Sequence, residues 1–313
     1  MNILIFPGQG SQYIGMGKEL ADNFSVAREV FEEVDDTIDF RLSKLMFEGH
    51  IDDLTKTENV QVAIMACGVA SLKILELLSN KKIEEFCHLC AGHSLGQYSA
   101  MYASGFFDLS TCAKILRNRG YFMRDSAVTA ETAMAAVIGA ETDFVLSTLA
   151  DASKLGVADL ANDNSNLQKV ISGEIIAINY AIDKFKEAGF KAIKLNVSSA
   201  FHSKLMEKAS KDMEEYLSGL DFMDGKIDII DNVTLKITND SSFLKQSLVK
   251  QIPATVRWRE TMDIIVSKKL PIVEIGASQI LSNMTKKSYA KSDVFSTANI
   301  KELEQVAGII NKS

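Results

Sequence analysis

Residues 92–96 read Gly-His-Ser-Leu-Gly, which fits the pattern G-x-S-x-G. This pattern is typical of a sharp turn between a strand and a helix that lifts a serine hydroxyl out of the backbone. Ser94 is therefore a candidate nucleophile. Because so short a pattern can arise by chance, the hypothesis also requires a base, an oxyanion site and a substrate contact elsewhere in the chain.

The base must be a side chain that takes the serine proton, because a serine hydroxyl is a poor nucleophile at neutral pH. The chain has 4 histidines. We place His50 in a polar turn, His88 in a strand, and His93 beside the serine, where a tight turn usually directs neighbouring side chains apart. His202 lies between an expected strand and an expected helix, where the sites of α/β sheets collect. It is the candidate base, with a structural role as the alternative.

A second loop could supply the oxyanion site. Residues 6–12 read Phe-Pro-Gly-Gln-Gly-Ser-Gln and follow the first expected strand. The glycines would let the backbone N–H of Gln9 approach a reacting carbonyl, with the N–H of Leu95 as the second donor. A plain glycine-rich turn is the alternative. The chain order also differs from that of α/β-hydrolases, whose histidine comes late, because a long segment still follows His202.

The composition limits the partners of the chain. Its formal net charge of −7 argues against a broad nucleic-acid surface, which needs a basic excess. No stretch approaches the roughly 18 uncharged apolar residues of a membrane span, and the N-terminus has no basic segment with a cleavage site. We expect a cytoplasmic protein with no nucleic-acid or membrane partner.

Residues 87–90 read Cys-His-Leu-Cys, the C-x-x-C spacing of zinc and redox pairs. A structural zinc site would need a second ligand pair, and none is suitably spaced. A redox pair of this kind usually begins a helix, whereas these residues lie in an apolar run that predicts a strand. We therefore favour buried strand cysteines, and we expect no metal and no cofactor.

The elements that must position these groups can be predicted from apolar periodicity. Helical spacing predicts helices at 17–37, 41–57, 59–79, 94–104, 108–126, 203–218, 241–251, 258–267 and 278–288. Short apolar runs predict strands at 2–6, 86–91, 226–230 and 270–275. This alternation predicts an α/β domain with a mostly parallel sheet, formed by residues 1–127 and 198–313.

The middle of the chain has a different pattern. Strands are predicted at 133–139, 156–161, 169–173 and 191–197, and helices at 142–153 and 174–188. The resulting order β-α-β-β-α-β is that of a ferredoxin-like subdomain. We expect it to be inserted into the larger domain over residues 128–197.

Seven groups of residues resemble, in order along the chain, the malonyl-CoA:acyl carrier protein transacylases. They are FPGQGSQ at 6–12, GHSLGQY at 92–98, RGYFM at 119–123, NDNS with VISG at 162–165 and 170–173, SAFH at 199–202, QIPATVRW at 251–258, and EIGASQIL at 274–281. The resemblance extends from the first strand to about residue 290. It implies a larger α/β-hydrolase-like domain with a small ferredoxin-like insert.

The resemblance also implies catalytic roles. Ser94 would attack the thioester of malonyl-CoA, and His202 would take its proton and return one to the departing thiol. The backbone carbonyl of Gln251 would orient the imidazole in place of an acidic residue, which stabilises an imidazolium less than an aspartate does. The backbone N–H groups of Gln9 and Leu95 would bind the oxyanion.

Further residues are implied to bind the substrate. Arg119 matches the arginine that binds the malonyl carboxylate, for which a planar fork of two donors is suited; from the residues alone, Arg117 competes with it. Met123 lies in the same motif. Phe201 should crowd the carbon between the two carbonyls and so disfavour methylmalonyl. Two asparagines in the NDNS motif, Asn162 and Asn164, either bind substrate or only hold their loop.

The function implied is transfer of malonyl from coenzyme A to the phosphopantetheine thiol of acyl carrier protein, by a ping-pong route through a malonyl-serine, in fatty-acid biosynthesis. The resemblance suggests a monomer. Alternatives are a free-standing acyltransferase of polyketide synthesis, a serine hydrolase or thioesterase, and an inactive scaffold that binds carrier protein. Retention of both Ser94 and His202 argues against the scaffold.

Three positions depart from the family pattern. Gln97 stands where the family usually has glutamate, Gly276-Ala277 where it has Gly-Pro, and Asn166-Leu167 where it has Pro-Gly. None of these positions is a proposed catalytic group. We expect them to change local loop shape and a helix start more than activity.

Overall fold

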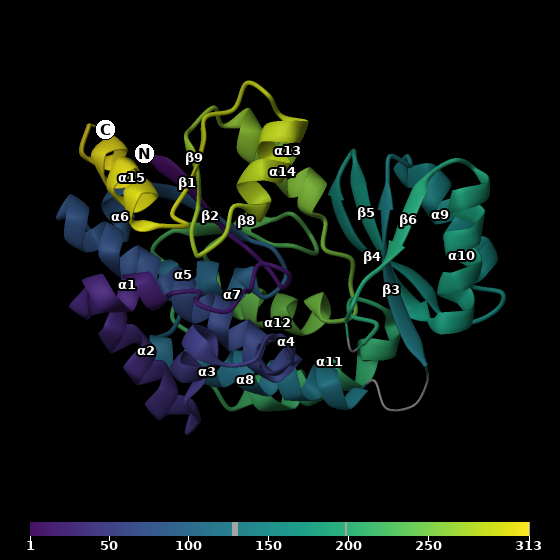
Figure 1. The fold of residues 1–313 in the computed structure, drawn as a ribbon, viewed down its shortest axis with the longest axis horizontal. Coiled ribbons are helices and arrows are strands. Elements are labelled where there is room, and N and C mark those ends of the chain that lie inside the picture. Colours follow the sequence, from purple (N-terminus) through teal and green to yellow (C-terminus); the bar gives the residue numbers. More distant parts are fainter. Residues whose placement is uncertain (127–130, 198, 313) are drawn as a thin grey trace.

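A computed structural model describes residues 1–126, 131–197 and 199–312 of the chain. It has a larger part built on a six-stranded sheet and a smaller part built on a four-stranded sheet. Figure 1 shows the smaller part at the right, where its helices α9 and α10 cover the side that faces away from the larger part. The predicted fold class is confirmed.

The larger sheet has the strand order β10-β9-β1-β2-β7-β8. Its strands are β1 (Asn2–Phe6), β2 (Cys87–Gly92), β7 (Asp228–Ile230), β8 (Ile237–Thr238), β9 (Ile272–Glu274) and β10 (Val294–Ser296). All neighbours are parallel except β7 and β8. Phe6 pairs with Gly92, so the loops after β1 and β2 begin at the same edge of the sheet.

Helices cover the larger sheet. They are α1 (Lys18–Asn23), α2 (Ser25–Ile38), α3 (Leu42–Glu48), α4 (Ile51–Thr55), α5 (Thr57–Ser79), α6 (Ile83–Phe86), α7 (Gly96–Ala103), α8 (Leu109–Asp125), α11 (Glu207–Ser218), α12 (Ser241–Gln251), α13 (Trp258–Ser267), α14 (Ile280–Ser288) and α15 (Ile300–Lys312), with a short 3₁₀ turn η2 (Lys204–Met206). Helix 17–37 was predicted as one element but is two, because Phe24 adopts an extended conformation between α1 and α2. Helix 41–57 is likewise divided, at the extended residues Gly49 and His50.

Helix α5 lies in the core, as its nearly uniform apolar composition predicts. By length and composition it could cross a membrane, since an 18-residue window has a mean hydropathy of 1.8, but 78% of that window is buried. The expectation that no segment approaches this apolar length was therefore wrong for α5. Its burial among α2, α8 and α15 is that of a core helix.

The smaller part has the strand order β4-β5-β3-β6, and all of its strand pairs are antiparallel. Its elements are β3 (Thr132–Ile138), α9 (Thr142–Ala152), β4 (Ala158–Ser165), β5 (Gln168–Glu174), α10 (Ile175–Glu187) and β6 (Lys191–Lys194). This is the predicted ferredoxin-like order, with its own apolar core. The predicted junctions, near residues 127–128 and at residue 198, lie outside the described residues, so the domain limits stay a prediction.

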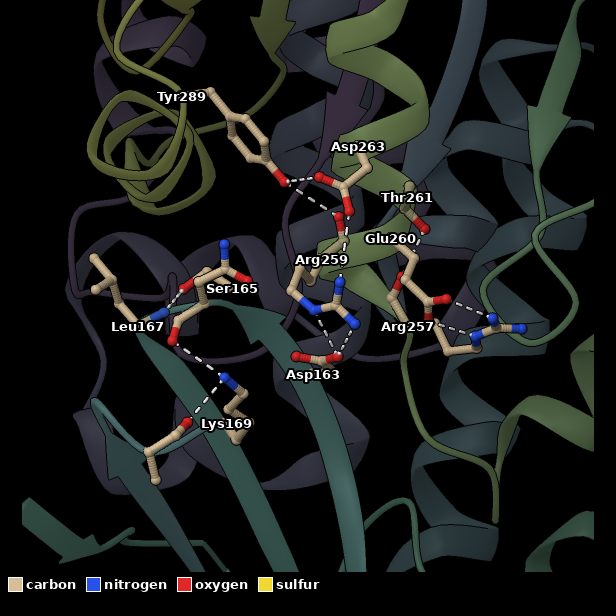
Figure 2. Close-up of polar contacts among 12 residues, drawn as sticks. Asp163, Ser165, Leu167, Lys169, Arg257, Arg259, Glu260, Thr261, Asp263 and Tyr289 are labelled. Atoms are coloured by element: carbon tan, nitrogen blue, oxygen red, sulfur yellow. Dashed lines mark hydrogen bonds and ion pairs between the residues drawn. The ribbon is translucent and has the colours of Figure 1, made fainter. Parts of the chain in front are cut away.

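Strand β4 joins the two parts. It extends to Ser165, four residues beyond the predicted strand end at 161, so the NDNS motif lies in a strand and not in a loop. Asn162 forms a parallel bridge with Val256, and the backbone N–H of Val256 donates to Ala161 at 2.9 Å. Figure 2 shows the adjoining ion pair, in which Arg259 of α13 lies 2.9 Å from the Asp163 carboxylate.

Candidate active site

The G-x-S-x-G motif forms the predicted turn between β2 and α7. Ser94 has a φ of 53°, in the left-handed region that non-glycine residues rarely adopt. A Cβ atom added at Gly92 would lie 2.0 Å from the backbone carbon of Gly96, and one added at Gly96 would lie 2.2 Å from the carbonyl oxygen of Phe6. The two glycines therefore allow this turn to pack against the loop after β1.

His202 lies where a base for Ser94 is required. Its Nε2 atom is 2.7 Å from Ser94 Oγ. Its Nδ1 atom is 3.0 Å from the carbonyl oxygen of Gln251 and 3.1 Å from that of Ala254. Because carbonyl oxygens only accept, Nδ1 carries the proton and Nε2 is free to accept from the serine. The carbonyl of Gln251 was predicted and that of Ala254 was not.

The surroundings keep His202 neutral. Burial, followed by the positive charge of Arg119, lowers the pKa of His202 to about 3, while the bond to the Gln251 carbonyl acts in the opposite direction. An imidazole with so low a pKa is unprotonated at neutral pH. The unliganded protein therefore holds this group in the form that can accept a proton.

Arg119 of α8 is a buried cation beside the nucleophile, with 1% of its surface exposed. Its Nη1 donates to Gln61 Oε1 at 2.6 Å, and its Nη2 donates to Ser94 Oγ at 3.2 Å and to Gln251 Oε1 at 3.3 Å. Burial lowers the pKa of its guanidinium. Among residues 1–126, 131–197 and 199–312, no carboxylate forms an ion pair with Arg119. This geometry suits the binding of an external anion.

Arg117, the alternative, lies differently. Its Nη1 donates to the carbonyl of Glu58 at 2.9 Å and to the side chain of Asn59. Its guanidinium carbon lies 5.0 Å from the ring centroids of both Phe40 and Tyr121. Arg117 therefore contacts other groups, whereas Arg119 contacts Ser94 directly.

A cavity of about 300 Å³ opens beside Ser94. The predicted site residues that line it are Gln9, Ser94, Leu95, Arg119, Met123, Asn162, Asn164, Phe201 and His202. Gln251 lies behind this surface, fully buried. The cavity thus brings together residues from β4 of the smaller part and from the sheet edge of the larger part.

His93, the neighbour of Ser94, contacts residues other than the nucleophile. Its Nε2 atom is 2.8 Å from Asn164 Oδ1, and its ring centroid is 5.4 Å from that of Trp258. Asn164 therefore has a partner in the larger part and helps to hold β4 there. Asn162 also lines the cavity, whereas Asp163 between them is directed to Arg259 (Figure 2).

A family model described as acyl transferase domain matches residues 3–310. The malonyl CoA-acyl carrier protein transacylase of Bacillus subtilis (strain 168) is 36% identical over 286 residues, which are 90% of this chain and 89% of that protein. The chain belongs to the malonyl-CoA:acyl carrier protein transacylase family. The crystal structure of the acyl-carrier-protein-S-malonyltransferase from Bartonella henselae matches this transacylase with a TM-score of 0.96 and 36% identity, over 99% of each chain.

A further solved structure is a type II polyketide synthase acyl-carrier protein in complex with its malonyl-transacylase. This transacylase matches it with a TM-score of 0.94 and 30% identity, over 98% of this chain and 99% of that chain. The shared fold therefore extends to a protein of polyketide synthesis.

Sequence reasoning missed two residues of the transacylase site. Asn232 Oδ1 accepts from the backbone N–H of Ser94 at 2.9 Å, and its Nδ2 donates to the carbonyl of Gly92 at 2.7 Å. Gln61 holds Arg119. Asn232 follows the end of β7, which pairs with β2, so its position after a predicted strand was a usable signal. Gln61 lies within the uniformly apolar α5, which gave no such signal.

The two cysteines of the C-x-x-C motif are buried in β2, as predicted. Their Sγ atoms lie 3.5 Å apart. The bond to Cys87, together with burial, raises the pKa of Cys90 well above its ordinary value. Neither thiol lines the cavity, so the pair lies outside the transacylase site.

Proposed function

We propose that this transacylase transfers a malonyl group from coenzyme A to the phosphopantetheine thiol of acyl carrier protein through a malonyl ester on Ser94, in fatty-acid biosynthesis. One observation carries this proposal. The Ser94 hydroxyl faces both a neutral base, His202, and a buried cation with no carboxylate partner among the described residues, Arg119. A hydrolase for neutral acyl chains would have no use for that cation.

The first half-reaction loads the serine. The malonyl carboxylate binds Arg119, while the thioester carbonyl lies against the backbone N–H groups of Gln9 and Leu95. His202 Nε2 takes the Ser94 proton as Oγ bonds the carbonyl carbon, and the two N–H groups stabilise the resulting oxyanion. The carbon–sulfur bond then breaks, and the leaving thiolate of coenzyme A takes the proton back from His202.

The second half-reaction reverses these steps with another thiol. His202 takes the proton of the phosphopantetheine thiol, and the sulfur bonds the ester carbonyl carbon. The ester bond to Ser94 Oγ breaks, and Oγ regains its proton from the imidazolium. Water would give hydrolysis at this stage, so transfer depends on its exclusion from the cavity.

Selectivity for malonyl is proposed to depend on two features. Arg119 binds the carboxylate, and Phe201, which lines the cavity beside His202, leaves little room for a methyl group on the malonyl carbon. Met123 and Asn162 line the same cavity and are proposed to contact the acyl group or its thioester arm. Asn164 is proposed to act mainly through His93, given its bond to that ring.

Wider assignments are also proposals. We infer a cytoplasmic monomer without nucleic-acid or membrane partners. The net charge of −7 supports the absence of a nucleic-acid partner, and the burial of α5 supports the absence of a membrane partner. One observation supports the polyketide alternative, namely the similarity to a transacylase that is in complex with a polyketide carrier protein. Transfer rates to fatty-acid and polyketide carrier proteins, measured side by side, would separate the two.

The decisive test is the intact mass of the protein after mixing with malonyl-CoA. The wild type should gain one malonyl group, and Ser94→Ala should gain none. Ser99→Ala is a matched control, since Ser99 is a buried serine on α7, the helix that follows Ser94. His202→Ala should slow acylation by about 10²-fold or more. An adduct on Ser94→Ala at the normal rate would overturn the mechanism.

A further inference from the structure

Asp231 is a buried carboxylate close to the active site that the mechanism does not use. It follows β7 and is 0% exposed. Its Oδ2 accepts from the backbone N–H and the hydroxyl of Thr234 at 2.7 and 2.6 Å. Its Oδ1 accepts from the Ser247 hydroxyl and, at 3.2 Å, from Gln97 Nε2. The side-chain oxygens of Asp231 act as acceptors in all of these contacts.

The contact with Asp231 and the backbone N–H of Asn232 together fix the orientation of the Gln97 amide. Because Asp231 offers only acceptors, the NH₂ group of Gln97 must face it, and the amide oxygen must face the other way. That oxygen accepts from Gln251 Nε2 at 2.9 Å and from the backbone N–H of Asn232 at 3.2 Å. Gln97 is itself fully buried, so no solvent competes for either end of the amide.

The Gln97 amide oxygen in turn helps to orient the Gln251 amide. Its NH₂ group donates to Gln97 and, at 3.1 Å, to the backbone carbonyl of Ser94. Its amide oxygen is thereby left to accept from Arg119 Nη2 at 3.3 Å. A reversed Gln251 amide would instead direct its NH₂ group at the guanidinium, so that two donors would face each other.

We propose that Asp231 is a positioning residue for malonyl transfer, which acts through the amides of Gln97 and Gln251 on Arg119 and Ser94. The inference rests on the proposed function, because it assumes that Arg119 binds the malonyl carboxylate. It also explains the departure at position 97. A glutamate there would place a second carboxylate against Asp231, and two acceptors of like charge repel.

If Asp231 acts in this way, the amide at position 97 and the carboxylate at position 231 can exchange places. Gln97→Glu alone should lower kcat/KM for malonyl-CoA by roughly tenfold or more. The new carboxylate repels Asp231, and residues in one buried hydrogen-bond network are coupled in energy. Asp231→Asn alone should lower the malonyl-to-acetyl ratio of kcat/KM, because an amide at 231 can turn its own NH₂ group toward Gln97 and leaves only the backbone N–H of Asn232 to orient the Gln97 amide. The double variant Gln97→Glu/Asp231→Asn restores one carboxylate facing one amide, and should recover most of both losses.

Ser247→Ala is the matched control. It removes a different donor to Asp231 and leaves the Gln97 contact in place, so it should lower Tm without changing the malonyl-to-acetyl ratio. Additive effects of the two single substitutions, with no recovery in the double variant, would overturn the proposal. If Gln97→Glu does not fold, an unchanged malonyl-to-acetyl ratio in Asp231→Asn overturns it equally.

The outcomes separate this inference from the proposed function. If the wild type forms no malonyl adduct by intact mass, the proposed function fails. If the wild type forms the adduct but positions 97 and 231 show no coupling, only the role of Asp231 fails. Rescue of both Tm and the malonyl-to-acetyl ratio by the exchange supports positioning, whereas rescue of Tm alone would mean a purely structural pair and would overturn the inference.

Discussion

Replacing Arg119 with alanine should change which acyl group the enzyme prefers while leaving Ser94 able to accept one. The substitution removes the buried cation that lies 3.2 Å from the nucleophile. The Ser94–His202 pair, joined at 2.7 Å, does not depend on that contact. We therefore expect selectivity for the carboxylate to be lost before the acylation chemistry is.

The size of the effect follows from the contacts of the guanidinium. Nη1 bonds Gln61 with one of its two N–H groups, and the contacts of Nη2 with Ser94 and Gln251 are long, at 3.2 and 3.3 Å. A carboxylate that takes the second N–H of Nη1 and replaces a contact of Nη2 can receive two charge-assisted hydrogen bonds. Each such bond contributes about 1.5–3 kcal/mol, and about 1.4 kcal/mol is a factor of ten. The malonyl-to-acetyl ratio of kcat/KM should therefore fall by roughly 10²- to 10⁴-fold in Arg119→Ala.

The assay is a competition between malonyl-CoA and acetyl-CoA, with the two acyl-enzymes resolved by intact mass. Arg117→Ala is the control, because Arg117 is a neighbouring arginine of α8 that contacts Glu58 and Asn59 instead. Arg119→Lys should give an intermediate ratio, since lysine keeps the charge and loses the planar fork. A wild-type ratio in Arg119→Ala, with a reduced ratio in Arg117→Ala, would reassign the carboxylate contact to Arg117.

Three further predictions concern specificity, stability and pH. Phe201→Ser should raise the methylmalonyl-to-malonyl ratio of kcat/KM by roughly 10- to 200-fold in the same competition assay; an unchanged ratio would remove Phe201 from the specificity argument. Replacing Cys87 and Cys90 with alanine should lower Tm, as emptied core positions do, and leave transfer rates nearly unchanged; stoichiometric zinc in the purified protein would contradict this. Because the folded-state pKa of His202, about 3, lies below its ordinary 6.5, the unfolded chain binds a proton that the folded chain does not, so stability should fall as pH decreases from 6.5 toward 3. Urea unfolding should show a smaller loss of this kind in His202→Gln, and equal losses in both proteins would refute it.

Much of the fold could be predicted from the sequence because its periodicity is strong. The β-α-β-β-α-β order of the smaller part and the central strands β1 and β2 are as predicted. Short edge elements were missed. Strand β8 has two residues, Ile237–Thr238, and β10 has three, Val294–Ser296, too few to show alternation. Such strands depend on pairing with neighbours that the sequence does not reveal.

Part of the candidate site could be predicted from the sequence, namely the residues whose type and position indicate a chemical role. Ser94 and His202 could be named because a serine in this motif and a histidine between a strand and a helix are rare, whereas Arg119 was preferred to Arg117 only through the family resemblance. The residues that hold them could not be named. Asn232, Gln61 and the side chain of Gln251 act by hydrogen bonds across long sequence separations, and an isolated amide in a sequence carries no sign of its partner.

In the proposed mechanism, Arg119 also connects recognition of the carboxylate to the strength of the base. After burial, its charge is the largest cause that lowers the pKa of His202. A carboxylate bound to Arg119 would offset that charge, so malonyl-CoA would raise the proton affinity of the imidazole that acts on it, whereas an acetyl group would not. Arg119→Ala removes the charge itself, which should make His202 a stronger base toward acetyl-CoA. The shift in preference in that variant should thus come from slower malonyl transfer and faster acetyl transfer together.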